Sequence, residues 1–313
     1  MQTLLTNSPI SAAEFIRRGG IVAFPTETVY GLGANIFDES AIAKIFEAKR
    51  RPNDNPLIAH VGNLEQIKLL VKEITPHAQK FIEEFFPAPL TLVLPKAKKV
   101  PLIATANLPT IGVRMPKNDL ALEFLKNCGT PIVAPSANLS GRPSPTTWQA
   151  VFEDLNGRID AILQGEATDI GLESTVVDCT SDVPLVLRSG AITLEQLQEI
   201  EPKTRLYKLK KNEIPKSPGL KHRHYSPTAK VVLGSSKFKV QSPKSSAFIG
   251  LNKPERDFQK IKICASVEEY AHSIFAFFRE CDYENITTIY CEKVAENGIG
   301  LALMDRLKRA SDS

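Results

Sequence analysis

Apolar and polar positions divide the first two thirds of the chain into short strands and helices. Continuous apolar runs predict strands at residues 21–24, 57–61, 91–94, 111–115, 132–135, 159–163, 174–179 and 185–187. Helical spacing of apolar residues predicts helices around 40–50, 76–85, 120–126, 147–155 and 194–200. The capping box Ser11-x-x-Glu14 predicts one more helix, which Gly19 and Gly20 would end. Because strands and helices do not alternate strictly, we expect an α/β domain with a mixed, twisted sheet.

The pattern restarts beyond Pro227. Strands are predicted at 230–233, 247–251 and 287–291, and helices at 267–281 and 299–309. These elements predict a small C-terminal α/β domain of Rossmann-like type. We therefore expect a first domain over 1–205, a linker over 206–227 and the small domain over 228–313.

Composition is that of an ordinary soluble globular protein. The 313 residues are 42% hydrophobic and 24% charged, and the five cysteines are scattered without a C-x-x-C pair or a zinc-ligand pattern. The start of the chain lacks the features of a secretory leader, and no apolar run approaches the roughly 18 residues of a membrane span. We expect a cytoplasmic protein with reduced structural thiols, no metal-ligand set and no membrane contact.

Positive charge gathers in the expected linker. Residues 203–223 hold eight Lys and Arg residues and one Glu, a larger excess than the net charge of +4 of the whole chain. The stretch SPGLKHRHYSP, Ser217 to Pro227, ends this segment and places cations, histidines and a tyrosine between prolines. Such a stretch fits a charged linker, but it also fits a wall of a site that binds anions.

Polar residues follow several predicted strands directly. The strand at 21–24 runs into PTETVYGLG, where Gly31 and Gly33 fit either a tight turn or a close approach of the backbone to a ligand. A third glycine at dinucleotide spacing is missing, since Ile36 stands there, and the chain has no Walker loop.

Three consecutive cations, Lys49 to Arg51, end the helix predicted at 40–50. They either offset the helix dipole, for about 0.3 to 1 kcal/mol, or converge on a polyanion through charge-assisted bonds of about 1.5 to 3 kcal/mol each. Their spacing leaves both interpretations open.

Two polar residues, His60 and Arg114, lie within predicted apolar strands. Two others, Ser136 and Asn138, follow the strand predicted at 132–135. His60 lies within LIAHV, where it is either a hydrogen-bonded core histidine or a ligand contact. Arg114 lies within IGVRMP and needs an internal acid or an anionic ligand, because burying an unpaired arginine is costly. Ser136 and Asn138 would face the same side of an extended segment and suit ligand positioning better than covalent catalysis. Together these residues indicate a site that orients an anionic substrate whose own groups react.

The motifs resemble those of the L-threonylcarbamoyladenylate synthases, the family of the YrdC-like domain, in their long two-domain form. In chain order they are PTETVYGLG from Pro25, Lys49-x-Arg51 with RPNDNPL, Arg114-Met-Pro, Ser136-x-Asn138 with Ser140-Gly, ESTVVD from Glu173, LRSG from Leu187 and the stretch Ser217 to Pro227. The resemblance covers residues 10 to 227. It implies a twisted mixed sheet with flanking helices around a large cationic cavity.

The resemblance also implies an activity. L-Threonine, bicarbonate or CO2 and ATP would give threonylcarbamoyl-AMP and pyrophosphate, and a separate transferase would deliver the threonylcarbamoyl group to the adenosine beside the anticodon of tRNA. Mg²⁺ would accompany ATP, with no protein ligand assigned. The implied threonine contacts are Thr28, His60, Arg114, Ala134 and Ser174. The implied ATP contacts are Arg51, Asn55, Thr110, Ser136, Ser144 and Arg188, and the implied catalytic residues are Lys49, Arg51, Ser136 and Asn138.

Because a carbamate and a mixed anhydride are easily lost to water, such a site needs a lid. We expect the stretch Ser217 to Pro227 to supply it, with Ser217, Arg223, His224 and Tyr225 at the cavity. An alternative is an RNA-binding protein without catalysis, which the basic segment allows but which the scarcity of aromatic residues among its cations opposes. A carbamoyl-phosphate-dependent maturation factor is disfavoured, because the acylphosphatase-like and zinc-finger segments expected there are missing.

Overall fold

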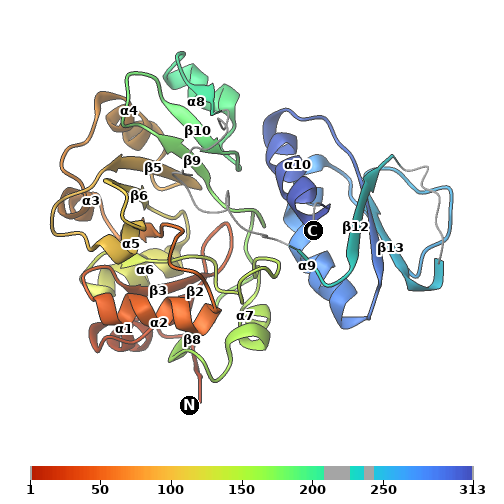
Figure 1. Cartoon of the computed structure of the whole chain (residues 1–313), viewed down its shortest axis with the longest axis horizontal. Helices are drawn as coiled ribbons and strands as arrows, with labels where there is room; N and C mark the ends of the chain where they lie inside the picture. The colour runs from red at the N-terminus through yellow and green to blue at the C-terminus, as the bar shows by residue number, and fades with distance from the viewer. Residues whose placement is uncertain (1, 208–225, 236–242, 312–313) are drawn as a thin grey trace.

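The computed structural model describes residues 2–207, 226–235 and 243–311, which form two sheets with helices packed on them (Figure 1). The larger sheet has eleven strands: β1 (Leu4–Thr6), β2 (Val22–Phe24), β3 (Gly31–Asn35), β4 (Ile58–His60), β5 (Leu90–Pro95), β6 (Thr110–Arg114), β7 (Ile132–Val133), β8 (Ala161–Leu163), β9 (Thr175–Asp178), β10 (Leu185–Arg188) and β11 (Arg205–Leu206). Its helices are α1 (Pro9–Arg17), α2 (Glu39–Lys49), α3 (Glu65–Leu70), α4 (Pro76–Phe85), α5 (Leu102–Thr105), α6 (Asp119–Cys128), α7 (Trp148–Leu155) and α8 (Leu194–Ile200).

The larger sheet is mixed, as the sequence predicts. Its strand order is β1-β8-β2-β3-β7-β4-β6-β5-β9-β10-β11, so strands distant in sequence lie side by side. β4 and β6 run parallel, whereas β7 lies antiparallel to both β3 and β4. Strands β4 and β6, which end in His60 and Arg114, are therefore neighbours at the centre of the sheet, next to β7.

The first helix begins earlier than the capping box predicts. Pro9 is its first residue and Ser8 its cap, with the Ser8 hydroxyl accepting a hydrogen bond from the amide of Ser11 at 3.2 Å. A proline at the first helical position loses no hydrogen bond and already has a helical φ angle, so the helix starts there and not at Ser11. The predicted helices at 76–85 and 194–200 are confirmed at both ends.

Gly31 and Gly33 lie in strand β3 and not in a tight turn. A Cβ on Gly33 would stand 2.8 Å from Cγ2 of Ile132, on the neighbouring strand β7. Glycine is therefore needed for close packing between strands, and the turn interpretation of this motif is wrong.

The smaller sheet contains β12 (Lys230–Gly234), β13 (Ser246–Gly250), β14 (Lys260–Ile263) and β15 (Thr288–Glu292), with every neighbouring pair parallel. Its helices are α9 (Val267–Tyr283) and α10 (Gly298–Ser311), and a 3-10 turn covers Pro243–Ser245. Strand β14 was not predicted, because it is an edge strand of alternating Lys and Ile whose two isoleucines remain more than 40% exposed.

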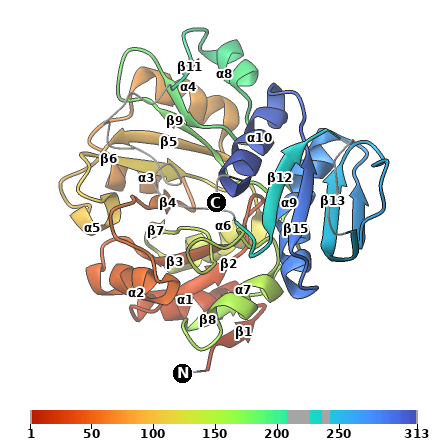
Figure 2. The same cartoon turned by 45° about the vertical axis from the view of Figure 1, so that its right-hand side comes forward.

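In Figure 1, helices α9 and α10 lie between the smaller sheet and the first part of the chain, and α10 is also seen there in the turned view of Figure 2. The larger sheet ends at Leu206 and the smaller one begins at Lys230. The expected domain boundaries stay predictions, since residues 208–225 of the expected linker lie outside the described residues. Within the described ranges, no helix is both long enough and apolar enough to cross a bilayer.

Candidate active site

A cavity of about 630 Å³, its open mouth included, lies over the centre of the larger sheet. Eight of the residues that the resemblance assigns to the site line it: Thr28, Arg51, His60, Arg114, Ala134, Ser136, Ser174 and Arg188. His60, Arg114 and Arg188 are the last residues of β4, β6 and β10. Thr28 follows β2, Ala134 and Ser136 follow β7, Ser174 directly precedes β9, and Arg51 follows helix α2. Three arginines on its wall make this cavity cationic, as expected.

Arg114 is the most deeply buried of these arginines. Its side chain is 5% exposed, and its Nη1 donates to the hydroxyl of Thr28 at 2.8 Å. Nη2 stands 2.6 Å from a carboxylate oxygen of Glu27, which balances the charge. Despite that contact, Nε and Nη2 of Arg114 have no hydrogen-bond partner of suitable geometry among the described residues. Buried guanidinium donors of this kind suit a carboxylate of a substrate.

His60 is the neighbour of Arg114 on the adjacent parallel strand. Burial, and next the charge of Arg114, lower the pKa of His60 to about 3, so the imidazole is neutral at physiological pH. Its Nδ1 lies 3.2 Å from the carbonyl oxygen of Ile58. Because a carbonyl can only accept, Nδ1 carries the hydrogen and Nε2 is left as an acceptor.

Ser174 connects strands β5 and β10 at the cavity wall. Its hydroxyl lies 2.8 Å from that of Thr91 on β5 and accepts from Nη2 of Arg188 at 3.1 Å. Arg188 also donates from Nε to the Ser174 carbonyl at 3.0 Å. These bonds hold a hydroxyl and a guanidinium together at the cavity wall.

The segment around Ser136 is held in place by strand β3. Ser136 forms an isolated antiparallel bridge with Gly31, and the amide of Ala137 donates to the Tyr30 carbonyl at 2.8 Å. The Ser136 hydroxyl donates to the amide oxygen of Asn138 at 2.6 Å. This pairing turns the end of β7 into an extended loop that faces the cavity with Ser136.

Lys49 lies one layer behind that loop. Its side chain is almost fully buried, and its Nζ donates to the carbonyls of Ser136 and Asn138, both at 2.5 Å. Burial, and next the charge of Arg51, lower the pKa of Lys49 well below its usual value. Neither Lys49 nor Asn138 lines the cavity. Their contacts fasten the loop that carries Ser136.

The remaining expected contacts lie around the cavity. Asn55 accepts from Arg51 through its carbonyl at 3.2 Å, and Ser144 donates to Glu173 at 2.5 Å. Thr110 lines a smaller adjoining cavity that shares residues 56–58 with the main one. The expected lid residues Ser217, Arg223, His224 and Tyr225 lie outside the described residues.

Sequence reasoning missed three acidic groups around this site. Glu27 pairs with Arg114, Glu173 lines the cavity, and Asp154 is buried behind the loop of Ser136. Glu27 and Glu173 lie within the quoted motifs, so their position was a usable signal, whereas Asp154 lies in a helix without any motif. In the part of the chain that the structure describes, no group of three His, Cys, Asp or Glu side chains could hold a metal ion.

The chain is similar to known proteins over almost its whole length. Residues 14–190 match the Sua5/YciO/YrdC family model, described as telomere recombination, and residues 192–312 match the model of the threonylcarbamoyl-AMP synthase C-terminal domain. The threonylcarbamoyl-AMP synthase of Pyrococcus abyssi is 44% identical over 96% of this chain and 93% of its own length. That of Bacillus subtilis is 40% identical over 98% of this chain and 94% of its own length.

The crystal structure of P. abyssi Sua5 complexed with L-threonine is similar over 99% of this chain and 97% of that chain, with a TM-score of 0.90 and 41% identity. Fold and site thus define a two-domain α/β enzyme with a YrdC-like domain, whose cavity is lined by three arginines. The chain belongs to the threonylcarbamoyl-AMP synthase family.

Proposed function

We propose that this chain makes L-threonylcarbamoyl-AMP from L-threonine, bicarbonate or CO2, and ATP, with release of pyrophosphate. This reaction is the first step in forming threonylcarbamoyladenosine next to the anticodon of tRNA. The observation that carries the proposal is the buried Arg114, which lines the cavity and bonds Thr28, while its Nε and Nη2 have no hydrogen bond of suitable geometry among the described residues. RNA binding without catalysis is not favoured, since the full-length relatives are synthases.

Threonine is proposed to bind at the end of the cavity formed by β4 and β6. Arg114 takes the carboxylate, and the neutral His60 offers Nε2 as an acceptor for an ammonium or hydroxyl hydrogen. Thr28 orients Arg114 through their 2.8 Å bond. Ser174 and Ala134 complete this wall.

ATP is proposed to lie along Arg51, Ser136 and Arg188, which line the same cavity. Two guanidinium groups there can stabilise phosphate oxygens by charge-assisted hydrogen bonds. Lys49 and Asn138 then act by holding the loop of Ser136, while Asn55, Thr110 and Ser144 lie around the nucleotide. Placing threonine and ATP on one cationic wall overcomes the repulsion between two anions.

The chemistry requires orientation more than a protein nucleophile. The threonine amine adds to CO2, and the carbamate oxygen then attacks the α-phosphorus of ATP in line while the bond to pyrophosphate breaks. The cations stabilise the charge that builds up on the phosphate and on the leaving pyrophosphate. No residue needs to become covalently modified in this sequence.

Mg²⁺ is proposed to enter with ATP and to stay on its phosphates. Glu173, the only carboxylate among the described residues that line the main cavity, already bonds Ser144 at 2.5 Å and Arg306 at 3.1 Å. With its one lining carboxylate already bonded, the cavity suits Mg²⁺ that is bound mainly by the ATP phosphates better than Mg²⁺ that is bound by protein ligands alone.

Two further expectations remain proposals. We place the protein in the cytoplasm, where ATP and threonine are available, and we expect a separate transferase to consume the labile product. The basic residues of the expected linker allow a contact with RNA at that stage.

Omission experiments test the reaction. Pyrophosphate release and incorporation of labelled bicarbonate are followed while threonine, bicarbonate or ATP is left out in turn. We expect both signals to require all three substrates. Pyrophosphate release that is independent of threonine would overturn the proposed function.

A further inference from the structure

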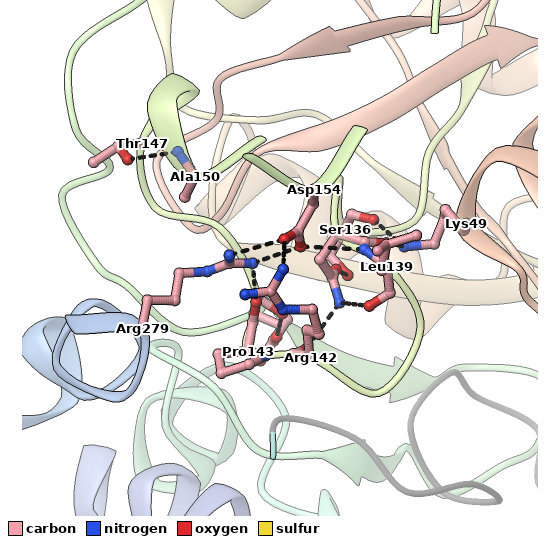
Figure 3. Close-up of polar contacts among 12 residues, drawn as sticks. Lys49, Ser136, Leu139, Arg142, Pro143, Thr147, Ala150, Asp154 and Arg279 are labelled. Atoms are coloured by element: carbon pink, nitrogen blue, oxygen red, sulfur yellow. Dashed lines mark hydrogen bonds and ion pairs between the residues drawn. The ribbon is translucent and has the colours of Figure 1, made fainter. Parts of the chain in front are cut away.

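The second domain contacts the active-site loop through one arginine of α9. The Arg279 side chain is 8% exposed, and it donates from Nη2 and Nη1 to the two carboxylate oxygens of Asp154 at 2.9 and 3.2 Å (Figure 3). Its Nη2 also donates to the carbonyl of Pro143 at 2.6 Å. One side chain of the small domain therefore binds both helix α7 and the end of the loop that begins at Ser136.

Asp154 connects this arginine to the middle of the loop. Its side chain is fully buried, and one of its oxygens accepts from the amide of Leu139 at 3.2 Å. The guanidinium of Arg142 pairs with the other oxygen. A buried carboxylate is costly unless charged donors satisfy it, so the position of Asp154 depends on the arginines around it.

Hydrogen bonds within the loop connect this contact to the cavity. The Asn138 side chain donates to the carbonyls of Leu139 and Arg142 at 2.8 and 2.9 Å and accepts from the Ser136 hydroxyl at 2.6 Å. Ser136 lines the cavity on the side proposed for ATP. A continuous set of hydrogen bonds thus runs from Arg279 to a nucleotide contact.

We propose that Arg279 is a positioning residue for ATP: by holding Asp154 and Pro143, it sets the place of the loop 136–143, so the small domain completes the nucleotide side of the active site. This inference rests on the proposed function. It assigns a catalytic contribution to a domain whose described residues do not line the main cavity.

The charges agree with this geometry. The pKa of Lys49, which holds the same loop, is lowered mainly by burial and by Arg51, and Asp154 raises it while Arg279 lowers it further. Both members of the Arg279–Asp154 pair therefore act electrostatically on the lysine that bonds the loop carbonyls.

A simple docking contact between the two domains is the competing explanation. Helix α9 offers a matched control, because Nδ1 of His272 contacts the Asp169 carbonyl at 3.0 Å. This bond also joins the two domains, but it does not involve Asp154 or the loop 136–143. His272→Ala thus removes an interdomain bond without touching the proposed contact.

The test compares Arg279→Met, Arg279→Lys and His272→Ala in the full-length protein. We measure kcat, the KM values for ATP and threonine, the Kd of a non-hydrolysable ATP analogue and the melting temperature. For Arg279→Met we expect the KM for ATP and the Kd of the analogue to rise about tenfold, because a misplacement of about 1 Å can cost up to ~10²-fold. The KM for threonine should change less than about twofold. For Arg279→Lys, the KM for ATP and the Kd of the analogue should lie between those of Arg279→Met and the wild type, since lysine keeps the charge but not the bidentate geometry.

Two results would overturn the proposal and show that Arg279 has only a structural role. One is an equal change in the KM values for ATP and threonine. The other is a lower kcat and a lower melting temperature with both KM values unchanged. Binding of the analogue is measured on the folded fraction, so that partial unfolding does not mimic the effect. Wild-type turnover in the omission experiments reports on the proposed function separately.

A double-mutant cycle gives a second, independent readout. Asp154→Asn and Arg279→Met interrupt the same connection, so their effects on the affinity for the ATP analogue should be clearly less than multiplicative when combined. Independent, multiplicative effects would contradict action through Asp154. Asp154→Asn keeps the volume of the side chain, which favours a folded variant for this measurement.

Discussion

His60 and Arg114 are directly paired neighbours on parallel strands, and the buried guanidinium helps to keep the imidazole neutral. The same pair forms the wall of the cavity at which threonine is proposed to bind. One charged and one neutral side chain thus stand side by side, the first suited to a carboxylate and the second to a hydrogen-bond donor.

The low pKa of His60 predicts a dependence of stability on pH. The folded-state pKa of about 3 lies below the ordinary value of about 6.5, so the unfolded state takes up a proton first as the pH falls. Stability should therefore decrease between about pH 6.5 and 3, and His60→Gln should lose less stability over that range. Urea unfolding at a series of pH values measures this difference. His77→Gln is a control at a partly exposed histidine, and equal acid sensitivity of His60→Gln and the wild type would contradict the prediction.

Arg114→Lys should weaken threonine binding selectively. Lysine cannot bond Thr28 and a substrate carboxylate with the same planar geometry, so we expect the KM for threonine to rise about tenfold or more, the equivalent of ~1.4 kcal/mol. The KM for ATP should change much less. Arg18→Lys, at a side chain that is 79% exposed, is the matched control and should behave as the wild type. An unchanged KM for threonine would exclude Arg114 as the carboxylate contact.

Lys49→Met should affect both stability and ATP binding. The substitution leaves the buried carbonyls of Ser136 and Asn138 without their donor, at a cost of about 1 to 3 kcal/mol in the free energy of unfolding. We expect a higher KM for ATP, because the loop of Ser136 loses its support. The control Lys44→Met lies in the same helix, α2, and removes an exposed hydrogen bond to the carbonyl of Gly19. It should change neither the free energy of unfolding nor the KM for ATP appreciably. Denaturant unfolding and steady-state kinetics of both variants decide the prediction.

The start of helix α1 gives a prediction about stability alone. Ser8→Ala should lower the free energy of unfolding by about 1 kcal/mol, because it removes the hydroxyl that caps the helix. Ser11→Ala should have almost no effect, since its side chain is exposed and does not cap the helix. The opposite order of the two effects would mean that the helix begins at the capping box after all.

The local motifs could be recognised from the sequence because residues that are close in each motif are also close in the structure. Lys49 and Arg51, Ser136 and Asn138, and the run from Thr28 to Gly33 each lie within a few residues. The apolar pattern located the helix at 40–50 and the strands at 21–24 and 132–135 that precede them. The resemblance then gave the class of reaction. Strands β1, β3, β11 and β14 and the short helices α3 and α5 were missed, because short elements leave too few positions for a periodic pattern.

By itself, the sequence determined the mixed α/β class, the course of the longer elements and eight of the residues that line the cavity. Only the tertiary structure decided how these residues divide between the cavity wall and its support: Arg114 lines the cavity, whereas Lys49 lies behind it. It also brought Asp154 together with Arg279, 125 residues further along the chain. No local pattern marks such a pair, because acidic and basic residues on helices are common at surfaces, and their burial results from how the two sheets and their helices pack.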